Sequence, residues 1–429
     1  MAKDNKKITI KKVLIWAIIL RVILVFISKW HPDLPNHIDW GLRFLSYGSK
    51  NFYENSVWGI SWPNQPFGSI LLFALMAIIK NWFFSSIMFL NNTFSFFPSF
   101  IIPVLESNLH AWLVKLPFIL SDIGLGYLIY KIVNQIKPQK AIFAACLFLF
   151  NPVLIYNSAI WGQTDSLINL LAILGIYLTF RKKYFLGIII FLSTFLFKLS
   201  LIIYLPIFGL LLLKRIKDWK SFILPTVAFI VFINLLAIPF KLAGFSSFQW
   251  IWYMYTNRVL PRQGSMLNGN AFNLWSLIFS IDISKSEFTQ VFGMSYQLIG
   301  RILYLLFLIP IWIKFIKNKL TLTNLLHALV LSAFCCFIFL TNMHERYLYP
   351  IFPLISILSV LPKPIFKLKS IIILSLIHFL NLYNLWFYPF IPFLKDILVG
   401  FNFIFCRLLS LILIIICFDY FIKYQKSEE

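Results

Sequence analysis

Long apolar runs, each bounded by a short polar or charged segment, follow one another along almost the whole chain. Runs of roughly 15–25 apolar residues have the length of membrane-spanning helices. The pattern therefore predicts an all-α fold, a polytopic transmembrane helical bundle of about 12 spans. The predicted spans are 13–29, 112–131, 140–157, 166–180, 184–198, 199–213, 221–240, 296–316, 322–340, 347–362, 369–388 and 399–423.

One long stretch, 30–111, interrupts this alternation near the start of the chain. It mixes polar segments and aromatic residues with two further apolar runs, 66–79 and 82–104, and only Lys80 lies between them. A single lysine is weak support for a cytoplasmic turn, so we interpret both runs as membrane-surface helices on the outer face. The alternative is a transmembrane hairpin, which adds two crossings and leaves every later span in the same orientation.

A second long stretch, 241–295, forms the other large external loop, rich in aromatic residues, glycines and asparagines. The two loops together are expected to cover the active site from outside. No internal repeat, low-complexity tract or soluble domain interrupts the pattern. We therefore predict one transmembrane domain over residues 1–429.

The composition supports a membrane protein and orients it. Hydrophobic residues make up 60% of the chain, charged residues only 12%, and the mean hydropathy is +0.84, more apolar surface than a soluble core hides. The net charge of +23 comes from Lys/Arg groups at every second boundary, which is the positive-inside pattern. Both termini are then cytoplasmic, the basic groups attract anionic membrane lipid, and nucleic-acid binding is not predicted. The basic groups are 3–12, 131–140, 181–183, 214–220, 314–319, 363–369 and 423–426.

The remaining composition signals concern processing and redox chemistry. All five cysteines lie inside apolar runs without metal or redox spacing, so we expect small core residues and no disulfide. The first apolar run is followed by Ser28-Lys29-Trp30, which offers no small-residue cleavage site, and we expect a retained span. The predicted location is the plasma (inner) membrane, multi-pass, with the active site on the extracytoplasmic side.

The first external loop offers two carboxylates as candidate catalytic groups, Asp33 and Asp39. Two flanking prolines keep Asp33 out of a helix interior and fix it on a loop after the first span, a position that suits a general base. Asn36 is typical of a helix N-cap, which places Asp39 in the first turn with Arg43 four residues further on. Asp39 thus has a structural explanation that Asp33 lacks. Asp33 is the favoured base, and Asp39 is the competing candidate.

The same loop contains the two short patterns His31-x-Asp33 and His37-x-Asp39. Two histidines and two carboxylates are sufficient ligands for zinc or manganese. Their spacing matches no standard metal site, and polar residues at a membrane surface are often only solvated. A divalent metal is therefore the less favoured interpretation, and no metal ligand is assigned.

Trp161, Gln163 and Asp165 form a compact polar motif at the outer start of a predicted span. Asp165 would lie in the first helical turn, where the helix dipole favours a carboxylate, so capping is one explanation. An amide beside an indole ring also suits sugar hydroxyls and the apolar face of a sugar. We favour a substrate-binding role for all three residues.

His344, Glu345 and Arg346 stand together at the outer junction of two spans. Charged groups at membrane depth are costly unless they lie in a cavity, which favours function over a simple ion pair. The planar guanidinium of Arg346 can hold a phosphate through two parallel hydrogen bonds. These residues are predicted to bind the substrate.

Five further residues complete the candidate substrate site. Lys198 lies between two apolar runs, and it either binds an anion or extends its ammonium group to the membrane surface. Arg258 and Arg262, in the second large loop, are further candidate phosphate ligands. Asn270 and Asn273 precede an apolar helix, and their amides either cap it or bind a ligand; spacing alone does not decide between these roles.

Taken in order, these motifs make the chain resemble the GT-C superfamily of polytopic glycosyltransferases, which use polyprenyl-phosphate sugars. Within that superfamily it resembles the bacterial proteins related to the second mannosyltransferase of GPI-anchor synthesis. The resemblance extends from about residue 30 to residue 350. The matching elements are Asp33, Trp40 to Tyr53, Trp62 to Pro66, Leu116-Pro117 with Asp122, Trp161-Gly162-Gln163-x-Asp165, Lys198 before Leu205-Pro206, Asn270-x-x-Asn273-Leu274-Trp275 and His344-Glu345-Arg346-Tyr347.

The resemblance implies an inverting hexose transfer, mannose-like, on the extracytoplasmic face. The polyprenyl-phosphate sugar is the donor, and a glycan, lipid or protein hydroxyl is the acceptor. Asp33 would take the acceptor proton while Arg346, His344 and Lys198 or Arg258 hold the departing phosphate. Phosphate leaves readily without a general acid, so one carboxylate among several cations suffices, unlike in glycoside hydrolysis.

Two other functions compete with glycosyl transfer. A transporter or flippase of a lipid-linked or small polar substrate would also place Lys198 and the Glu345-Arg346 pair within the membrane. Transporters usually concentrate polar groups near the bilayer midplane and show repeated halves, whereas this sequence concentrates them at one face without a repeat. A non-catalytic scaffold is disfavoured because packing alone does not require such charge clusters.

Overall fold

The computed structural model describes residues 8–28, 30–362 and 364–427, apart from the side chain of Arg262. These residues are helical almost throughout, and among them one hairpin is formed by two strands of two residues each, β1 (Gln290–Val291) and β2 (Met294–Ser295). The all-α prediction is confirmed.

The helices of the first half are α1 (Ile10–Ile27), α2 (Leu34–Asn51), α3 (Phe67–Thr93), η1 (Ser99–Ile101), α4 (Ile102–Asn134), α5 (Pro138–Leu149), α6 (Pro152–Ile155), η2 (Tyr156–Trp161), α7 (Asp165–Phe180), α8 (Tyr184–Ser193), η3 (Thr194–Leu196), η4 (Leu199–Tyr204) and α9 (Leu205–Arg215). Those of the second half are α10 (Lys220–Ala237), η5 (Ile238–Phe240), α11 (Ser247–Tyr253), η6 (Met254–Val259), η7 (Leu260–Gln263), α12 (Leu274–Phe279), α13 (Tyr296–Lys317), α14 (Leu322–Phe339), η8 (Glu345–Leu348), α15 (Ile351–Leu358), α16 (Leu368–Tyr383) and α17 (Pro392–Lys426).

Helices lie in every segment that the apolar pattern predicted to be a span. Among the described residues, six helical segments are long and apolar enough to cross a membrane, or seven if α5 and the α6–η2 segment, bent by 49°, form one span. Helices α7, α8 and α16 are apolar but shorter. These lengths and compositions suit a membrane protein, and the number of crossings stays a prediction. The long apolar segments contain α3, α4, α10, α13, α14 and α17.

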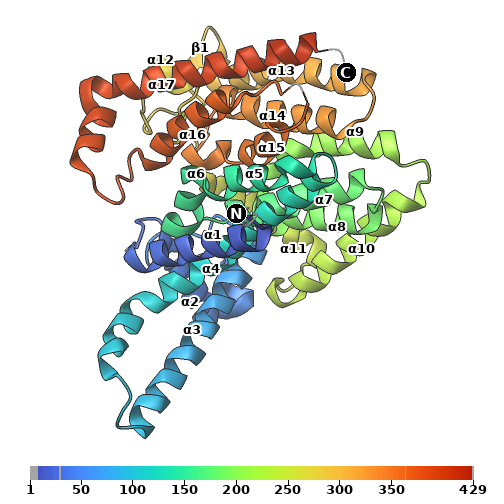
Figure 1. Cartoon of the computed structure of the whole chain (residues 1–429). Helices are drawn as coiled ribbons and strands as arrows, with labels where there is room; N and C mark the ends of the chain where they lie inside the picture. The colour runs from blue at the N-terminus through green and yellow to red at the C-terminus, as the bar shows by residue number, and fades with distance from the viewer. Residues whose placement is uncertain (1–7, 29, 363, 428–429) are drawn as a thin grey trace, which may run out of the picture.

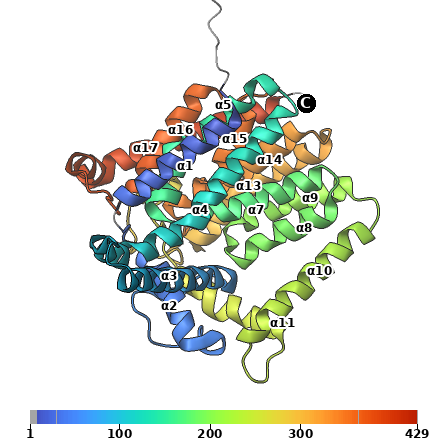
Figure 2. The ribbon, with the colours of Figure 1, turned by 60° about the horizontal axis from the view of Figure 1, so that its bottom comes forward.

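Helix α14 lies at the centre of the molecule. Every residue from Asn324 to Phe339 is buried, because α13, α15 and α17 pack around this helix. A helix that is apolar on all sides is expected in such a position. By contrast, α10 and α13 expose large aliphatic and aromatic side chains outward, as helices that face lipid do. Figure 2 shows α4 between α1 and α7, and contacts with both neighbours bury its second half.

A long hairpin of α3 and α4 projects from the bundle (Figure 1). No residue is buried after Ala77 on α3 or before Leu109 on α4, so this arm has only its own two helices to pack against. Helix α4 runs without interruption through residue 111, where we had expected the external loop to end. The helix continues because no proline or glycine lies between Pro103 and Pro117, although Glu106, Ser107 and Asn108 interrupt the apolar run; where this segment meets the membrane stays a prediction.

Three helix breaks shape the end of the bundle where the candidate site lies. The first falls at Asn151-Pro152, and the second is the π-helical turn η2, which ends at Gly162 in the left-handed conformation (φ 82°). At the third, Lys198 has an extended backbone (φ −161°, ψ 141°) between η3 and η4. The predicted spans 184–198 and 199–213 are therefore two short broken helices.

The basic loops gather at one end of the bundle. The Lys214 ammonium group donates to the carbonyl of Asn318 at 2.7 Å, and Lys314 donates to the carbonyl of Ser427 at 2.6 Å. Near them, Tyr184 donates to the carbonyl of Arg215 at 3.1 Å. Helices α7 and α14 each join this end to the opposite one. With 16 and 18 residues and a rise of about 1.5 Å per residue, they place their other ends roughly 25 Å away.

Candidate functional site

Asp33 forms the N-cap position of α2, six residues after the end of α1. Its Oδ2 accepts hydrogen bonds from the Trp161 indole at 3.1 Å and from the Gln163 amide at 2.5 Å. Its Oδ1 accepts a third from the side-chain amide of Asn36 at 2.9 Å. The predicted cap at Asn36 is therefore wrong: the helix starts earlier, because the proline at its second position suits a first turn. Three donors hold the carboxylate in a fixed orientation.

The backbone at Gly162 explains how both donors reach Asp33. A β-carbon at this position would lie 2.9 Å from Leu34 Cδ1 and 3.0 Å from Lys115 Cγ, and its φ of 82° disfavours other residues. The preceding π-helical turn rotates Trp161 inward, where it is fully buried. Glycine at the turn lets Trp161 and Gln163 point at the same oxygen.

His31 packs beside Asp33 as a buried ring. It stacks on Trp161 with the ring centroids 4.5 Å apart, and its Nδ1 accepts the Asp33 backbone N–H at 3.2 Å. Burial lowers the pKa of His31 to about 3, and burial likewise lowers the pKa of His37 to about 4. Both rings are neutral at physiological pH. Among the described residues, no group of three or more His, Cys, Asp or Glu side chains is placed to hold a metal ion.

Asp165 joins the two principal cations of the site. Its Oδ1 lies 3.0 Å from the Lys198 ammonium group, and its Oδ2 lies 3.9 Å from Arg346 Nε. Arg346 also pairs with Glu345 at 2.9 Å and lies over the Trp161 ring with Cζ 5.4 Å from the centroid. Lys198 is buried, so the alternative in which it reaches for the membrane surface is wrong. Asp165 positions cations rather than serving only as a cap.

Charge sets the protonation states in this cluster. Burial, the largest single effect, would raise the pKa of Asp33, but the Arg346 guanidinium, the two histidines and the Trp161 hydrogen bond together outweigh it and hold that pKa below its usual value. Burial raises the pKa of Glu345, against the opposing effect of Arg346. Burial lowers the pKa of His344 to about 3. At neutral pH Asp33 is therefore ionised and His344 is neutral.

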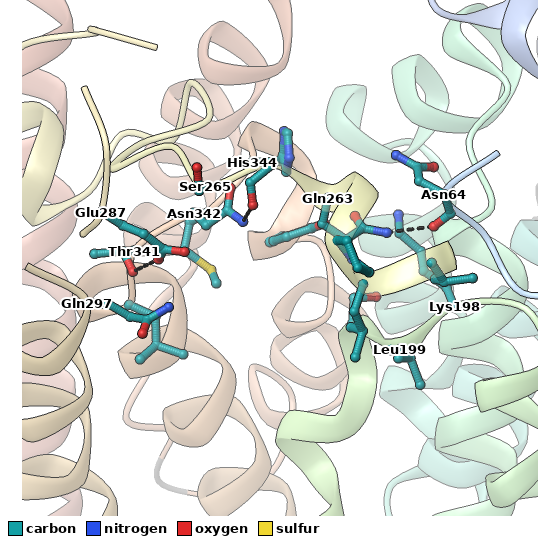
Figure 3. Close-up of a pocket in the computed structure, with 18 of the residues that line it drawn as sticks. Asn64, Lys198, Leu199, Gln263, Ser265, Glu287, Gln297, Thr341, Asn342 and His344 are labelled. Carbon is teal, nitrogen blue, oxygen red and sulfur yellow. Dashed lines mark hydrogen bonds between the residues drawn. The ribbon is translucent and has the colours of Figure 1, made fainter. Parts of the chain in front are cut away.

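A cavity of about 700 Å³ opens beside this cluster. Lys198, His344 and Arg346 line it, whereas Asp33, Trp161, Gln163 and Asp165 do not. Asp33 and Arg346 nevertheless belong to one cluster, since both contact Trp161. Figure 3 shows residues from both external loops around the cavity. The polar residues of its wall are Asn64, Gln65, Lys198, Ser200, Gln263, Ser265, Glu287, Gln297, Arg301, Thr341, Asn342, His344, Arg346 and Tyr347.

Asp39 has the structural role that its spacing indicated. It pairs with Arg43 at 3.2 Å, and it also accepts the backbone N–H of Gly59 at 3.0 Å. These contacts tie the chain after α2 back onto that helix. The competing candidate for the base is thus fully occupied in the packing of the first external loop.

Arg258 is engaged away from the cavity. Its guanidinium binds the carboxylate of Glu54, which also accepts a hydrogen bond from Tyr253 at 3.3 Å. This ion pair joins the two large external loops, and the amide of Gln263 adds a hydrogen bond to the carbonyl of Asn64. Arg258 therefore fastens the two loops together. The prediction for the Arg262 side chain lies outside the described residues.

Asn270 and Asn273 prove to be structural. Asn270 exchanges side-chain and backbone hydrogen bonds with Asn384 and Asn381, with distances of 2.6–2.8 Å. Asn273 caps α12 by accepting the N–H groups of Trp275 and Ser276. Of the two roles that the sequence left open, capping is observed for Asn273, whereas Asn270 bonds to Asn381 and Asn384.

Sequence reasoning missed a buried polar network below the site. Arg21 on α1 pairs with Asp122 on α4 at 3.1 Å, and neither side chain is exposed. The Tyr349 hydroxyl donates to Asp122 at 2.7 Å and also lies 3.2 Å from the Ser166 hydroxyl. Arg21, an arginine inside an apolar run, was the available signal, because intramembrane charges usually have partners.

A scan of the chain against models of protein families matched none of them, and a search of curated proteins found no match. The chemistry of the site therefore carries the functional argument.

Proposed function

We propose that this chain is an integral membrane glycosyltransferase that moves a hexose, mannose-like, from a polyprenyl-phosphate donor to an acceptor hydroxyl on the extracytoplasmic face. The observation that carries the proposal is the single cluster formed by Asp33, Asp165, Lys198 and Arg346 around Trp161. It brings the oriented carboxylate of Asp33 together with Asp165 and two cations beside a cavity. Inverting sugar transfer from a phosphate leaving group needs this set of charges.

The cations have the chemistry to bind the donor phosphate. Arg346 presents a planar fork, Lys198 presents a point charge, and both line the cavity with the neutral ring of His344. In the structure Glu345 and Asp165 occupy part of their hydrogen-bonding capacity. The singly charged phosphodiester of the donor would compete for Arg346 with these carboxylates, and the second charge that develops on the phosphate as its bond to the sugar breaks would strengthen the interaction.

Asp33 has the position of the base, provided that Arg346 moves. Its carboxylate is ionised, so it can take the acceptor proton as the hydroxyl oxygen attacks the anomeric carbon and the bond to phosphate breaks. Asp33 does not line the cavity. The reaction therefore requires the phosphate to draw Arg346 away, which would open a path from the cavity to Asp33.

The sidedness of the molecule supports an extracytoplasmic site and about 12 spans. The described basic groups gather at the end of the bundle opposite Asp165 and His344, and the positive-inside rule makes that end cytoplasmic. Broken helices near Lys198 and Gly162 supply irregular backbone where it borders the site, which membranes tolerate only in protein-lined surroundings.

A transporter is the second candidate, and the break at Lys198 favours it. Discontinuous helices that present a charged residue at the break are typical of transporter binding sites. A transporter would move a lipid-linked or polar substrate across the bilayer without forming a bond.

One experiment separates these functions. The protein is reconstituted in liposomes with labelled polyprenyl-phosphate hexoses and a lysate of glycan and lipid acceptors, and bound label is separated from donor. We expect transfer by the wild type, a loss of at least 100-fold in Asp33→Asn, and near-normal transfer in Asp39→Asn at matched protein levels. If the label crosses the membrane and no new bond forms, the result would reject the glycosyltransferase and favour the transporter. Full transfer by Asp33→Asn would remove Asp33 as the base.

A further inference from the structure

The cavity has a second end with a chemistry unlike that of Lys198 and Arg346. Glu287, Gln297, Thr341 and Asn342 form it, together with Ser265 from the second external loop. Figure 3 shows these side chains on the side of the cavity away from Lys198. One end thus offers Lys198 and Arg346, and the other offers a carboxylate, two amides and two hydroxyl groups, with Arg301 one helical turn beyond Gln297.

Glu287 is the unusual member of this group. It is only 6% exposed, and among the described residues no cation lies within ion-pairing distance of it. The Thr341 hydroxyl donates to its Oε2, and the described residues supply no donor to Oε1. A buried carboxylate with so little compensation is costly unless further donors reach it from the cavity.

The neighbouring amides are also underused. The side-chain nitrogen of Asn342 donates to the carbonyl of Gly264 at 3.0 Å, while its buried Oδ1 has no partner among the described residues. Gln297 lines the cavity, and none of its side-chain atoms has a hydrogen bond to another described residue. Unused acceptors beside a free amide match a ligand with several hydroxyl groups.

We propose that this end of the cavity, the Glu287 end, binds the hydroxyl groups of a pyranose ring. The inference rests on the proposed function and adds a sugar subsite to it. A carboxylate accepts two sugar hydroxyls, and amides donate to and accept from others. The cationic end then receives the phosphate, so the two ends suit the two parts of a sugar phosphate. The ring belongs to the donor or to the acceptor, because both carry the same hydroxyl chemistry.

The test compares Glu287→Gln and Gln297→Ala with the wild type in the transfer assay, varying donor and acceptor separately. Gln297→Ala breaks no hydrogen bond between described residues, so it keeps the test valid if Glu287→Gln folds poorly. Glu106→Gln makes the same chemical change at an exposed position on α4 and serves as the control. Both test variants should raise one KM about tenfold or more while the control does not. A rise in the donor KM assigns the ring to the donor, and a rise in the acceptor KM assigns it to the acceptor.

A binding measurement keeps this inference separate from the proposed function. Free hexoses and short oligosaccharides are titrated into the purified protein, and tryptophan fluorescence reports binding. We expect weak binding by the wild type that Glu287→Gln and Gln297→Ala reduce and Glu106→Gln preserves. Absence of transfer by the wild type would reject the glycosyltransferase and leave sugar binding intact. Unchanged KM values and unchanged sugar binding in both variants would overturn the subsite.

Discussion

Arg346 is the residue that links the charges of this site. It contacts Glu345, approaches Asp165 and lies over the rings of Trp161 and Tyr347, and only 15% of its side chain is exposed. A lysine would keep the positive charge but lose the planar fork and the stacking. Replacing Arg346 with lysine therefore distinguishes two explanations of phosphate binding: positive charge alone, or two parallel hydrogen bonds from one guanidinium group.

We predict that Arg346→Lys raises the donor KM by about 10- to 100-fold, because one of two charge-assisted hydrogen bonds to phosphate is lost. The donor dependence of transfer measures this change. Arg43→Lys is the matched control, since Arg43 pairs with Asp39 outside the cavity. An unchanged donor KM in Arg346→Lys, with the control also unchanged, would remove Arg346 from the phosphate site.

At the scale of the elements, the apolar pattern correctly predicted helix in every segment assigned as a span, but it did not predict the breaks within those segments. Asp33 was identifiable because two prolines constrain it locally, and the Asp39–Arg43 pair follows from helical spacing. No local sequence feature indicated Glu287, because the Ser265 carbonyl, the Thr341 hydroxyl and the cavity around it come from distant segments. Local spacing predicts caps and i,i+4 pairs, whereas burial and partners depend on tertiary packing.

The network of Arg21, Asp122, Tyr349 and Ser166 connects α1, α4 and α7 with the segment after Arg346. It thereby fixes the elements that carry Asp33, Asp165 and Arg346 relative to one another. Because both charges are fully buried, removing one leaves the other without compensation.

We predict that Asp122→Ala lowers the free energy of unfolding by about 3–5 kcal/mol, while the double replacement Arg21→Met with Asp122→Leu recovers most of it. Thermal unfolding of the purified protein in detergent measures both effects. Asp419→Ala, which breaks an exposed pair with Lys423, should change stability by less than about 1 kcal/mol. A double replacement as unstable as Asp122→Ala would contradict the charge explanation and indicate that the shapes of these side chains matter.

At the scale of the whole molecule, charge and polar chemistry lie at opposite ends of an apolar bundle. The arm of α3 and α4 projects from this bundle (Figure 1). Its tip contains Phe96 and Phe100, which are 83% and 80% exposed, and it carries no charge between Lys80 and Glu106. Such a surface is stable only in contact with lipid or another apolar surface.

Single cysteines introduced into a variant without native cysteines test this arrangement through a membrane-impermeant maleimide on intact cells. We predict that Ser56→Cys, in the first external loop, reacts from outside, whereas Lys317→Cys reacts only after permeabilisation, because positively charged loops stay on the cytoplasmic side. Ser95→Cys, at the tip of the arm, should also react from outside, because α4 is one continuous helix from Ile102 to Asn134 and its C-terminal end lies beside the basic loop at Arg181. Reaction of Ser95→Cys only after permeabilisation would place both ends of the continuous helix α4 on the cytoplasmic side and would contradict the assigned sidedness. Reaction of Ser56→Cys and Lys317→Cys from the same side would contradict the sidedness on which the proposed reaction depends.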